Sequence, residues 1–188
     1  MRIRLVYSKR DGACFVPHIA LAQIFSRAAR RAGLNLVMTQ GYSPRPKLSF
    51  APELPAGVVA LRELVDIFTA QNCPSLSLIN SALPEGFSVS ETLIIPDDAC
   101  GLGKFCSHAQ YFIRPALPDA VSEFFGTALC EAEEYEDWLR VIISQPAQNP
   151  IGGLVKHLTA ENIISGWHEI NIVRASIGTL RGGEIHAD

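Results

Sequence analysis

The chain has 188 residues, of which 48% are hydrophobic, and a formal net charge of −3, which fits one domain or two small ones around an apolar core. The N-terminal sequence MRIRLVYSKRDG lacks the apolar stretch of a signal peptide, and no run approaches the roughly 20 apolar residues of a membrane span. Five scattered cysteines without a secretion signal are typical of reduced thiols, so we expect a cytoplasmic protein with no membrane contact.

Strand and helix patterns alternate through the first half of the chain. The alternating sequence RIRLVYS predicts a strand over residues 2–8, and Pro17 opens an amphipathic helix that stops at Gly33. LNLVMT predicts a second strand over residues 34–39. The other elements predicted in this half are a short strand in KLSFAP, a strand over residues 63–70, a helix over residues 74–83 and a strand over residues 87–95.

A linker over residues 97–108 separates this half from a second, less regular one. The elements predicted there are a strand in AQYFIRP, a helix over residues 118–130, a strand in DWLRVIIS, a helix over residues 154–164 and a strand in HEINIVRASIG. Both halves follow a βαβ order. We therefore predict an α+β fold of two ferredoxin-like (split βαβ) units, residues 1–96 and 109–188, the second degraded.

Charge is divided unevenly between the two halves. Through Lys47 the chain has nine cations against one acid, Asp11, a net +8, and the remainder has seven cations against 18 acids, a net −11. This division predicts a basic surface that meets phosphate or an acidic partner. The alternative is that the basic and acidic parts attract each other within the fold.

Four pieces of sequence carry a family resemblance. They are YSKRDGACFVPH, IFSRAARRAGLNL, TQGYSPRPKLSFAPELPAGV and ELVD, within residues 4–66, about a third of the chain. In this order they resemble the uncharacterised radical SAM-linked proteins, a domain of unknown function found beside or fused to cobalamin-binding radical SAM proteins. The resemblance implies a radical SAM enzyme as partner and RNA as a candidate target. It supplies no known activity.

The sequence departs from this family at two notable positions. Pro17 precedes His18 where the family commonly has Ser, and Arg45 stands where it often has a histidine. A histidine-dependent role at position 45 is therefore not expected.

The cysteines do not predict a cofactor or metal site. No three of them are close enough in sequence to hold an iron–sulfur cluster, and there is no Gly-rich phosphate loop, so the chain is not expected to be the radical SAM enzyme itself. Cys100, Cys106, His108 and Cys130 could form a metal set, but their spacing is wider than that of zinc ligand pairs. Buried thiols are the commoner explanation.

His18 is the titratable group with the most chemical interest. In the first turn of a helix, the positive end of the dipole favours a neutral imidazole that accepts a proton. Beside Lys47 or Arg45, such a base would suit metal-independent RNA cleavage. The alternatives are a contact with ligand or RNA, or a structural role as a helix cap or loop hydrogen bond.

The stretch QGYSPRPKLSF combines cations with an aromatic ring, which suits single-stranded RNA, whereas a stiffened solvent-exposed loop is the alternative. Glu63 and Asp66 belong to the resemblance and should point to opposite faces of their strand. We expect Asp66 to bind loop amides or Lys47. The candidate binding residues are His18, Gln40, Gly41, Tyr42, Pro44, Arg45, Lys47, Ser49, Glu63 and Asp66, and a basic patch of Arg27, Arg30 and Arg31 extends them.

These residues predict an accessory, non-catalytic binding module that works with a radical SAM enzyme and contacts RNA through a basic N-terminal surface. A metal-independent ribonuclease with His18 as base, or a purely protein-binding scaffold, are the alternatives.

Overall fold

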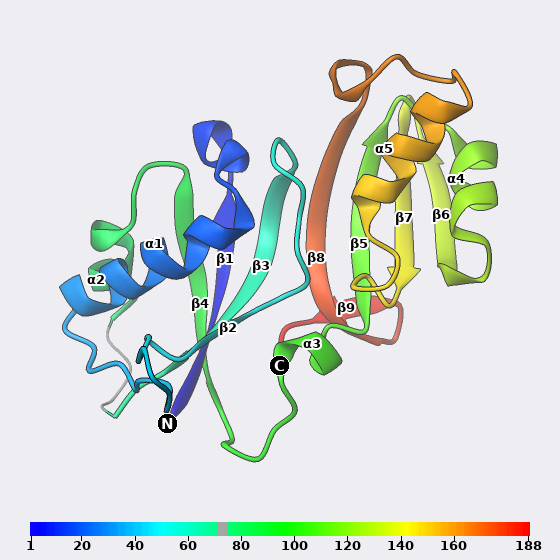
Figure 1. The fold of residues 1–188 in the computed structure, drawn as a ribbon. Coiled ribbons are helices and arrows are strands. Elements are labelled where there is room, and N and C mark those ends of the chain that lie inside the picture. The colour runs from blue at the N-terminus through cyan, green and yellow to red at the C-terminus, as the bar shows by residue number, and fades with distance from the viewer. Residues whose placement is uncertain (71–74) are drawn as a thin grey trace.

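The first half of the chain forms one part of a large sheet with two helices on one side (Figure 1). Its elements are β1 (Arg2–Lys9), η1 (Asp11–Phe15), α1 (His18–Arg31), β2 (Leu48–Phe50), β3 (Val59–Phe68), α2 (Leu76–Ala82) and β4 (Phe87–Ile95). The strands lie in the order β4-β1-β3-β2, and each neighbouring pair is antiparallel.

The second half repeats this order in the other part of the sheet. Its elements are α3 (Leu102–Phe105), β5 (His108–Arg114), α4 (Pro118–Phe125), η2 (Gly126–Ala128), β6 (Leu129–Tyr135), β7 (Trp138–Ser144), α5 (Ile151–Ala160), η3 (Trp167–Glu169), β8 (Asn171–Arg181) and β9 (Glu184–His186). The strands lie in the order β8-β5-β7-β6, again antiparallel, and β9 pairs with β8.

A short parallel contact between β3 and β8 joins the two parts into one sheet. Val59 pairs with Val173 and Ala60 pairs with Arg174. The result, in a computed structural model that describes residues 1–70 and 75–188, is a mixed α/β fold dominated by this sheet. Figure 1 shows the helix pairs α1/α2 and α4/α5 on the same side of it.

The apolar core continues across the junction between the halves. Side chains alternate along β1, so that Ile3, Leu5 and Tyr7 pack beneath α1 in one cluster. Val6 points the other way and belongs to a cluster that includes Val141 on β7. The packing of the two halves is therefore continuous. Within the described residues, no helix has the length and apolar character needed to cross a membrane.

Residues 34–39 were predicted to form a strand, and the structure differs there. Isolated bridges join Leu36 to Thr69 and Met38 to Pro46, and β2 instead occupies the place of a regular strand next to β3. Within LNLVMT, Leu36 packs on the core, whereas Val37 and Met38 are both exposed. The apolar pattern therefore does not correspond to a regular strand.

Two strands escaped the sequence prediction. The helix predicted over residues 118–130 ends at Phe125, Gly126 adopts a positive φ of 49°, and β6 follows after η2. The sequence did not predict β6 as a strand because this segment is rich in Glu, which is uncommon in strands. The short β9 was also missed, and α3 forms within the predicted linker. Cys73 and Pro74 lie outside the described residues.

Candidate functional site

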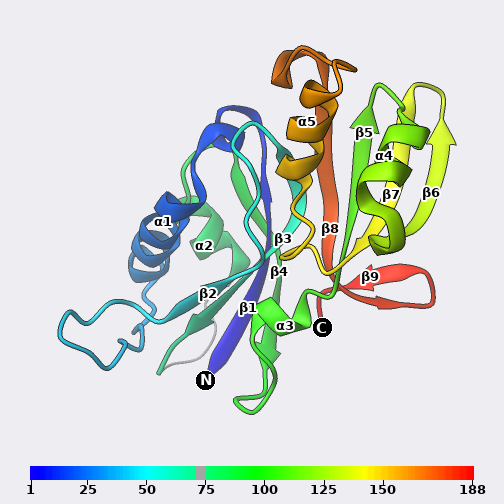
Figure 2. The ribbon, with the colours of Figure 1, turned by 45° about the vertical axis from the view of Figure 1, so that its right-hand side comes forward.

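Residues 37–47, here called the arm, form an irregular hairpin between α1 and β2. Lys47 N–H donates to the Val37 carbonyl at 2.7 Å, and Thr39 N–H donates to the Arg45 carbonyl at 2.7 Å. The Thr39 hydroxyl accepts a hydrogen bond from Arg45 N–H at 3.0 Å. These bonds hold the two sides of the arm together. Figure 2 shows it projecting away from the sheet.

The turn of the arm is fully open to solvent. Tyr42 has a relative exposure of 109%, and its ring has no packing role that would explain an aromatic residue there. The residues around it are also exposed: Gln40, Gly41, Ser43, Pro44, Arg45 and Lys47. Arg45 and Lys47 are therefore both accessible from solvent.

The basic face of α1 adjoins the base of the arm. Arg27, Arg30 and Arg31 are all exposed, and Arg30 lines a shallow hollow together with Met38 of the arm. From Gly12 to Pro52 the sequence contains no Asp or Glu. The arm and this helix face therefore form one surface with cations and no carboxylates of its own, here called the basic surface.

His18 begins α1 but does not meet the cations of the arm. Its ring packs edge-on against Phe50, with ring centroids 5.6 Å apart, and burial lowers the pKa of this half-buried imidazole. The ammonium group of Lys47 instead lies 4.2 Å from the ring centroid of Phe68. Phe50 packs beneath α1, and the alternation of β2 turns Lys47 to the opposite face. The expected proximity of His18 and Lys47 is not found.

Glu63 is buried on the α1 side of β3 and pairs with an arginine from the second half. Arg174 Nε donates to the Glu63 carboxylate at 2.5 Å, and its other contact with the carboxylate makes the pair bidentate. Arg174 also donates to the Pro52 carbonyl at 3.0 Å and to the Tyr111 hydroxyl at 3.5 Å. This pair joins β3 to β8 at the junction of the halves.

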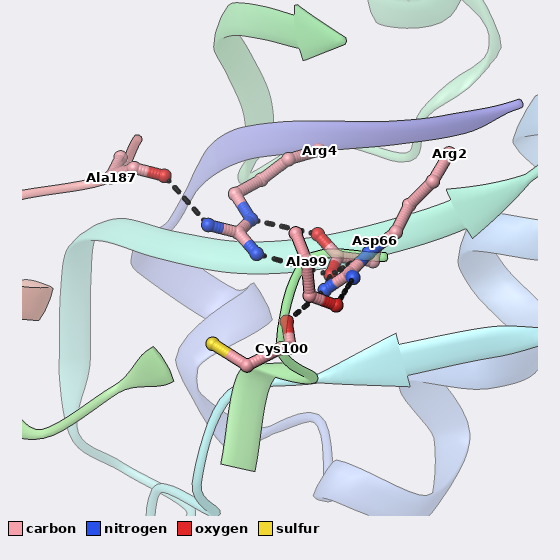
Figure 3. Close-up of polar contacts among 6 residues, drawn as sticks. All are labelled: Arg2, Arg4, Asp66, Ala99, Cys100 and Ala187. Carbon is pink, nitrogen blue, oxygen red and sulfur yellow. Dashed lines mark hydrogen bonds and ion pairs between the residues drawn. The ribbon is translucent and has the colours of Figure 1, made fainter. Parts of the chain in front are cut away.

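Asp66 is the centre of a second buried cluster, on the opposite face of β3 (Figure 3). Its carboxylate accepts hydrogen bonds from Nε of Arg2 and from Nε of Arg4, both at 2.8 Å. Backbone carbonyls accept further hydrogen bonds: Ala99 and Cys100 from Arg2, both at 2.8 Å, and Ala187 from Arg4, at 2.9 Å. Asp66 therefore pairs with these arginines, and the expected pairing with loop amides or Lys47 is not found.

Glu63 and Asp66 point to opposite faces, as the period of two predicted, but both are buried structural partners. Arg2, Arg4 and Lys9 are buried as well, so three of the nine N-terminal cations are withdrawn from any basic surface. Charged residues inside otherwise apolar strands, in RIRLV and ELVDIF, were the signal for these pairs. Arg174 likewise stands inside an apolar strand, in NIVRASIG, but no local pattern identifies its partner, which lies 111 residues away.

Ser49 lies half-buried in β2, away from the exposed turn of the arm. Within the described residues, no group of three or more His, Cys, Asp or Glu side chains could hold a metal ion. Cys14 and Cys106 are buried free thiols, Cys100 and Cys130 are exposed, and burial raises the pKa of Cys106 to about 12.

Comparison with known protein families assigns the chain to one of them. The model of a family described as "Uncharacterized protein conserved in bacteria (DUF2344)" matches residues 2–150. The chain belongs to this family. The DUF2344 match extends well beyond residues 4–66 and includes the arm, α1 and the first three strands of the second half, β5 to β7. No curated protein matches the chain.

Proposed function

We propose that this protein is an accessory, non-catalytic module that binds single-stranded RNA through the basic surface. The observation that carries the proposal is the arm itself, which presents the ring of Tyr42 to solvent beside Arg45. An exposed ring can stack on a base of any identity, while neighbouring cations track the phosphates. No carboxylate from this part of the chain opposes them.

The proposed partner is a radical SAM enzyme. The support is the resemblance of residues 4–66 to proteins that occur beside such enzymes. In this arrangement the module would hold RNA while its partner performs the chemistry. If the tagged protein, isolated from its native cells, recovers no radical SAM protein, this part of the proposal should be abandoned.

We also infer that each half is a ferredoxin-like unit, with residues 1–96 and 109–188 joined by residues 97–108. The support is the repeated strand order, β4-β1-β3-β2 in one half and β8-β5-β7-β6 in the other. Two helices on one side of each half are consistent with the same arrangement.

A salt-dependent RNA titration tests the binding surface. Labelled single-stranded RNA is titrated with the wild-type protein and with Arg45→Ala/Lys47→Ala at several salt concentrations. Each lost phosphate contact should reduce the slope of log affinity against log salt by about 0.7. Tyr42→Ala should weaken binding by about 1–3 kcal/mol, the loss expected for one stacked base.

The matched control is Lys156→Ala, which removes an exposed cation from α5 in the second half. It should leave both the affinity and the salt slope unchanged. Equal affinity of the arm variants and the wild type would contradict the proposed surface. Duplex RNA serves as a competitor, because it cannot offer unstacked bases to Tyr42.

A metal-independent ribonuclease has less support. Its general base, His18, packs against Phe50, and the candidate cation Lys47 lies over Phe68 on the other face. RNA cleavage in the presence of EDTA that is lost in His18→Ala would restore this alternative. A pull-down that yields a protein partner and no nucleic acid would instead favour a protein-binding scaffold.

A further inference from the structure

The second half of the sheet carries aromatic side chains on the face opposite α4 and α5. The strand registers place a row across that face: Glu133 on β6, Arg140 on β7, Phe112 on β5, Val173 on β8 and Val59 on β3. In the next row, Tyr135 pairs with Trp138. Phe112, Tyr135, Trp138 and Val173 line one open hollow of about 310 Å³. These four residues are here called the aromatic face.

A larger cleft continues this surface towards the junction of the halves. It has a volume of about 660 Å³ and shares Trp138 and Val173 with the aromatic face. Phe15 and Trp167 also line it, with relative exposures of 69% and 43%. Both tryptophans of the chain therefore lie on one connected, solvent-exposed surface.

The edge of this surface is strongly acidic. Residues 131–137, at the end of β6 and the turn to β7, include five carboxylates, of which Glu133, Glu134, Glu136 and Asp137 are exposed. The nearby cations are already engaged: Arg140 bonds Glu131 and Glu133 at 3.2 and 3.1 Å, and Arg114 bonds Asp137 at 2.5 Å. Such an edge repels phosphate and attracts cations.

The occupant that fits this surface is a basic segment with an exposed aromatic residue. Aromatic rings attract Lys and Arg side chains through their faces, and carboxylates pair with the same groups. The basic surface of this chain has that composition in the arm, with Tyr42, Arg45 and Lys47 exposed. Figure 2 shows the arm and β6 at opposite sides of the molecule, so the arm cannot reach the aromatic face of its own copy.

We propose that a second copy of this chain docks its arm on the aromatic face and the acidic edge beside it. The contact is heterologous, because one copy contributes the arm and the other contributes the face. Each copy then keeps one free arm or face, so the contact repeats into a ring or an open chain of copies. A single hairpin buries little surface, so the association is weak and depends on protein and salt concentration.

A charge exchange tests this contact with the full-length protein. Variant X carries Arg45→Glu and Lys47→Glu in the arm, and variant Y carries Glu133→Lys and Glu136→Lys at the acidic edge, where Glu133 lies in the same row as Phe112. Sedimentation of the wild type should show a mean mass that rises with concentration above the 20.5 kDa monomer and falls with salt. X alone and Y alone should remain monomeric. Their mixture should associate again, because opposite charges then meet at both contacts.

Tryptophan emission supplies an independent readout, because Trp138 belongs to the aromatic face and Trp167 lines the cleft that continues it. Emission should shift to shorter wavelength as wild-type protein is concentrated, and Tyr42→Ala should lose most of the shift. Circular dichroism confirms that the variants are folded. A wild type that stays monomeric at millimolar concentration, or a mixture of X and Y that fails to associate, would overturn the proposal.

Single-stranded RNA separates this inference from the proposed function. RNA bound to the arm should dissociate the copies, because both ligands use the same side chains. Self-association without RNA binding would leave the inference intact and remove the RNA proposal. If RNA instead changes tryptophan emission equally in the wild type and in X, the aromatic face is an RNA site and the docking proposal is wrong.

Discussion

The two halves of the sheet have the same strand order but use their second face in different ways. In the first half, that face holds Asp66 between Arg2 and Arg4, and residues 99, 100 and 187 close over the guanidinium groups. In the second half, the corresponding face presents Phe112 and Trp138 to solvent beside an acidic edge.

The difference shows that the strand order does not determine which side chains the second face presents or what that face can bind. On one face, Asp66 neutralises Arg2 and Arg4, and burial keeps these three side chains from contact with ligands. The aromatic residues on the other face line an open hollow and remain accessible to a ligand or partner. A function for this family has to be argued from a particular surface, and similarity of fold alone cannot supply it.

Loss of Asp66 should have the largest effect on stability. Asp66→Ala leaves two arginines buried without a counter-charge, which should lower the free energy of unfolding by about 3–5 kcal/mol. Urea denaturation measures the change. The matched control is Glu91→Ala, which breaks the half-exposed Arg62–Glu91 pair and should cost less than about 1 kcal/mol. Equal losses in the two variants would show that the buried cluster is not special.

Loss of Glu63 should weaken the junction between the halves. Glu63→Ala leaves Arg174 with the Pro52 carbonyl and the Tyr111 hydroxyl, so we expect a loss of about 3 kcal/mol. Amide hydrogen exchange should become faster at Ala60 and Arg174, which pair across β3 and β8. Unchanged exchange there, together with reduced stability, would mean that the pair stabilises the halves without joining them.

His18 should make a smaller, pH-dependent contribution. Burial lowers its pKa below the ordinary value of 6.5, with opposing effects from Glu53 and Glu63 and further lowering from Arg174 and Lys9. The folded protein binds this proton more weakly than the unfolded chain. The stability gained from neutral His18 is therefore full above the unfolded pKa and is lost as pH falls below it towards the folded pKa.

The measurement is the urea midpoint at about pH 7.5 and about pH 5.5, on either side of the ordinary histidine pKa. His18→Gln should lose less stability between these two values than the wild type does. The neighbouring charges are present in both proteins, so their own titration largely cancels in the comparison. An identical loss in both would mean that His18 is not the group responsible.

The aromatic face should tolerate substitution with almost no cost in stability. Tyr135 is 53% exposed, so Tyr135→Ser should change the free energy of unfolding by no more than about 0.5 kcal/mol. The same variant should weaken association between copies in sedimentation. A large loss of stability would show that Tyr135 stabilises the fold. The two faces would then not differ in their contribution to stability.

The sequence was most informative where one local rule decides the structure. Alternation predicted β1, Pro17 preceded α1 as expected, and β4 was predicted at its observed bounds. Local patterns failed where distant partners decide. Residues 34–39 look like a strand but form only isolated bridges at the start of the arm, and the acidic β6 is a strand because β7 lies beside it.

The candidate site shows the same limit. Exposure of Tyr42 and Arg45 followed from a polar, proline-containing loop. The charges of Arg2 and Arg4 suggested a basic surface, yet the fold buries both against Asp66. The pairing of Glu63 with Arg174 depends on the register of two strands from different halves, and no local pattern carries that information.

The long separation between Glu63 and Arg174 has a consequence for the growing chain. During synthesis, Glu63 emerges 111 residues before its partner, so the strand that carries it has an open edge towards the missing half. A charge that points inward at such an edge discourages pairing with strands of other molecules. Until the second half is made, we expect Glu63 to disfavour pairing of this open edge with strands of other molecules.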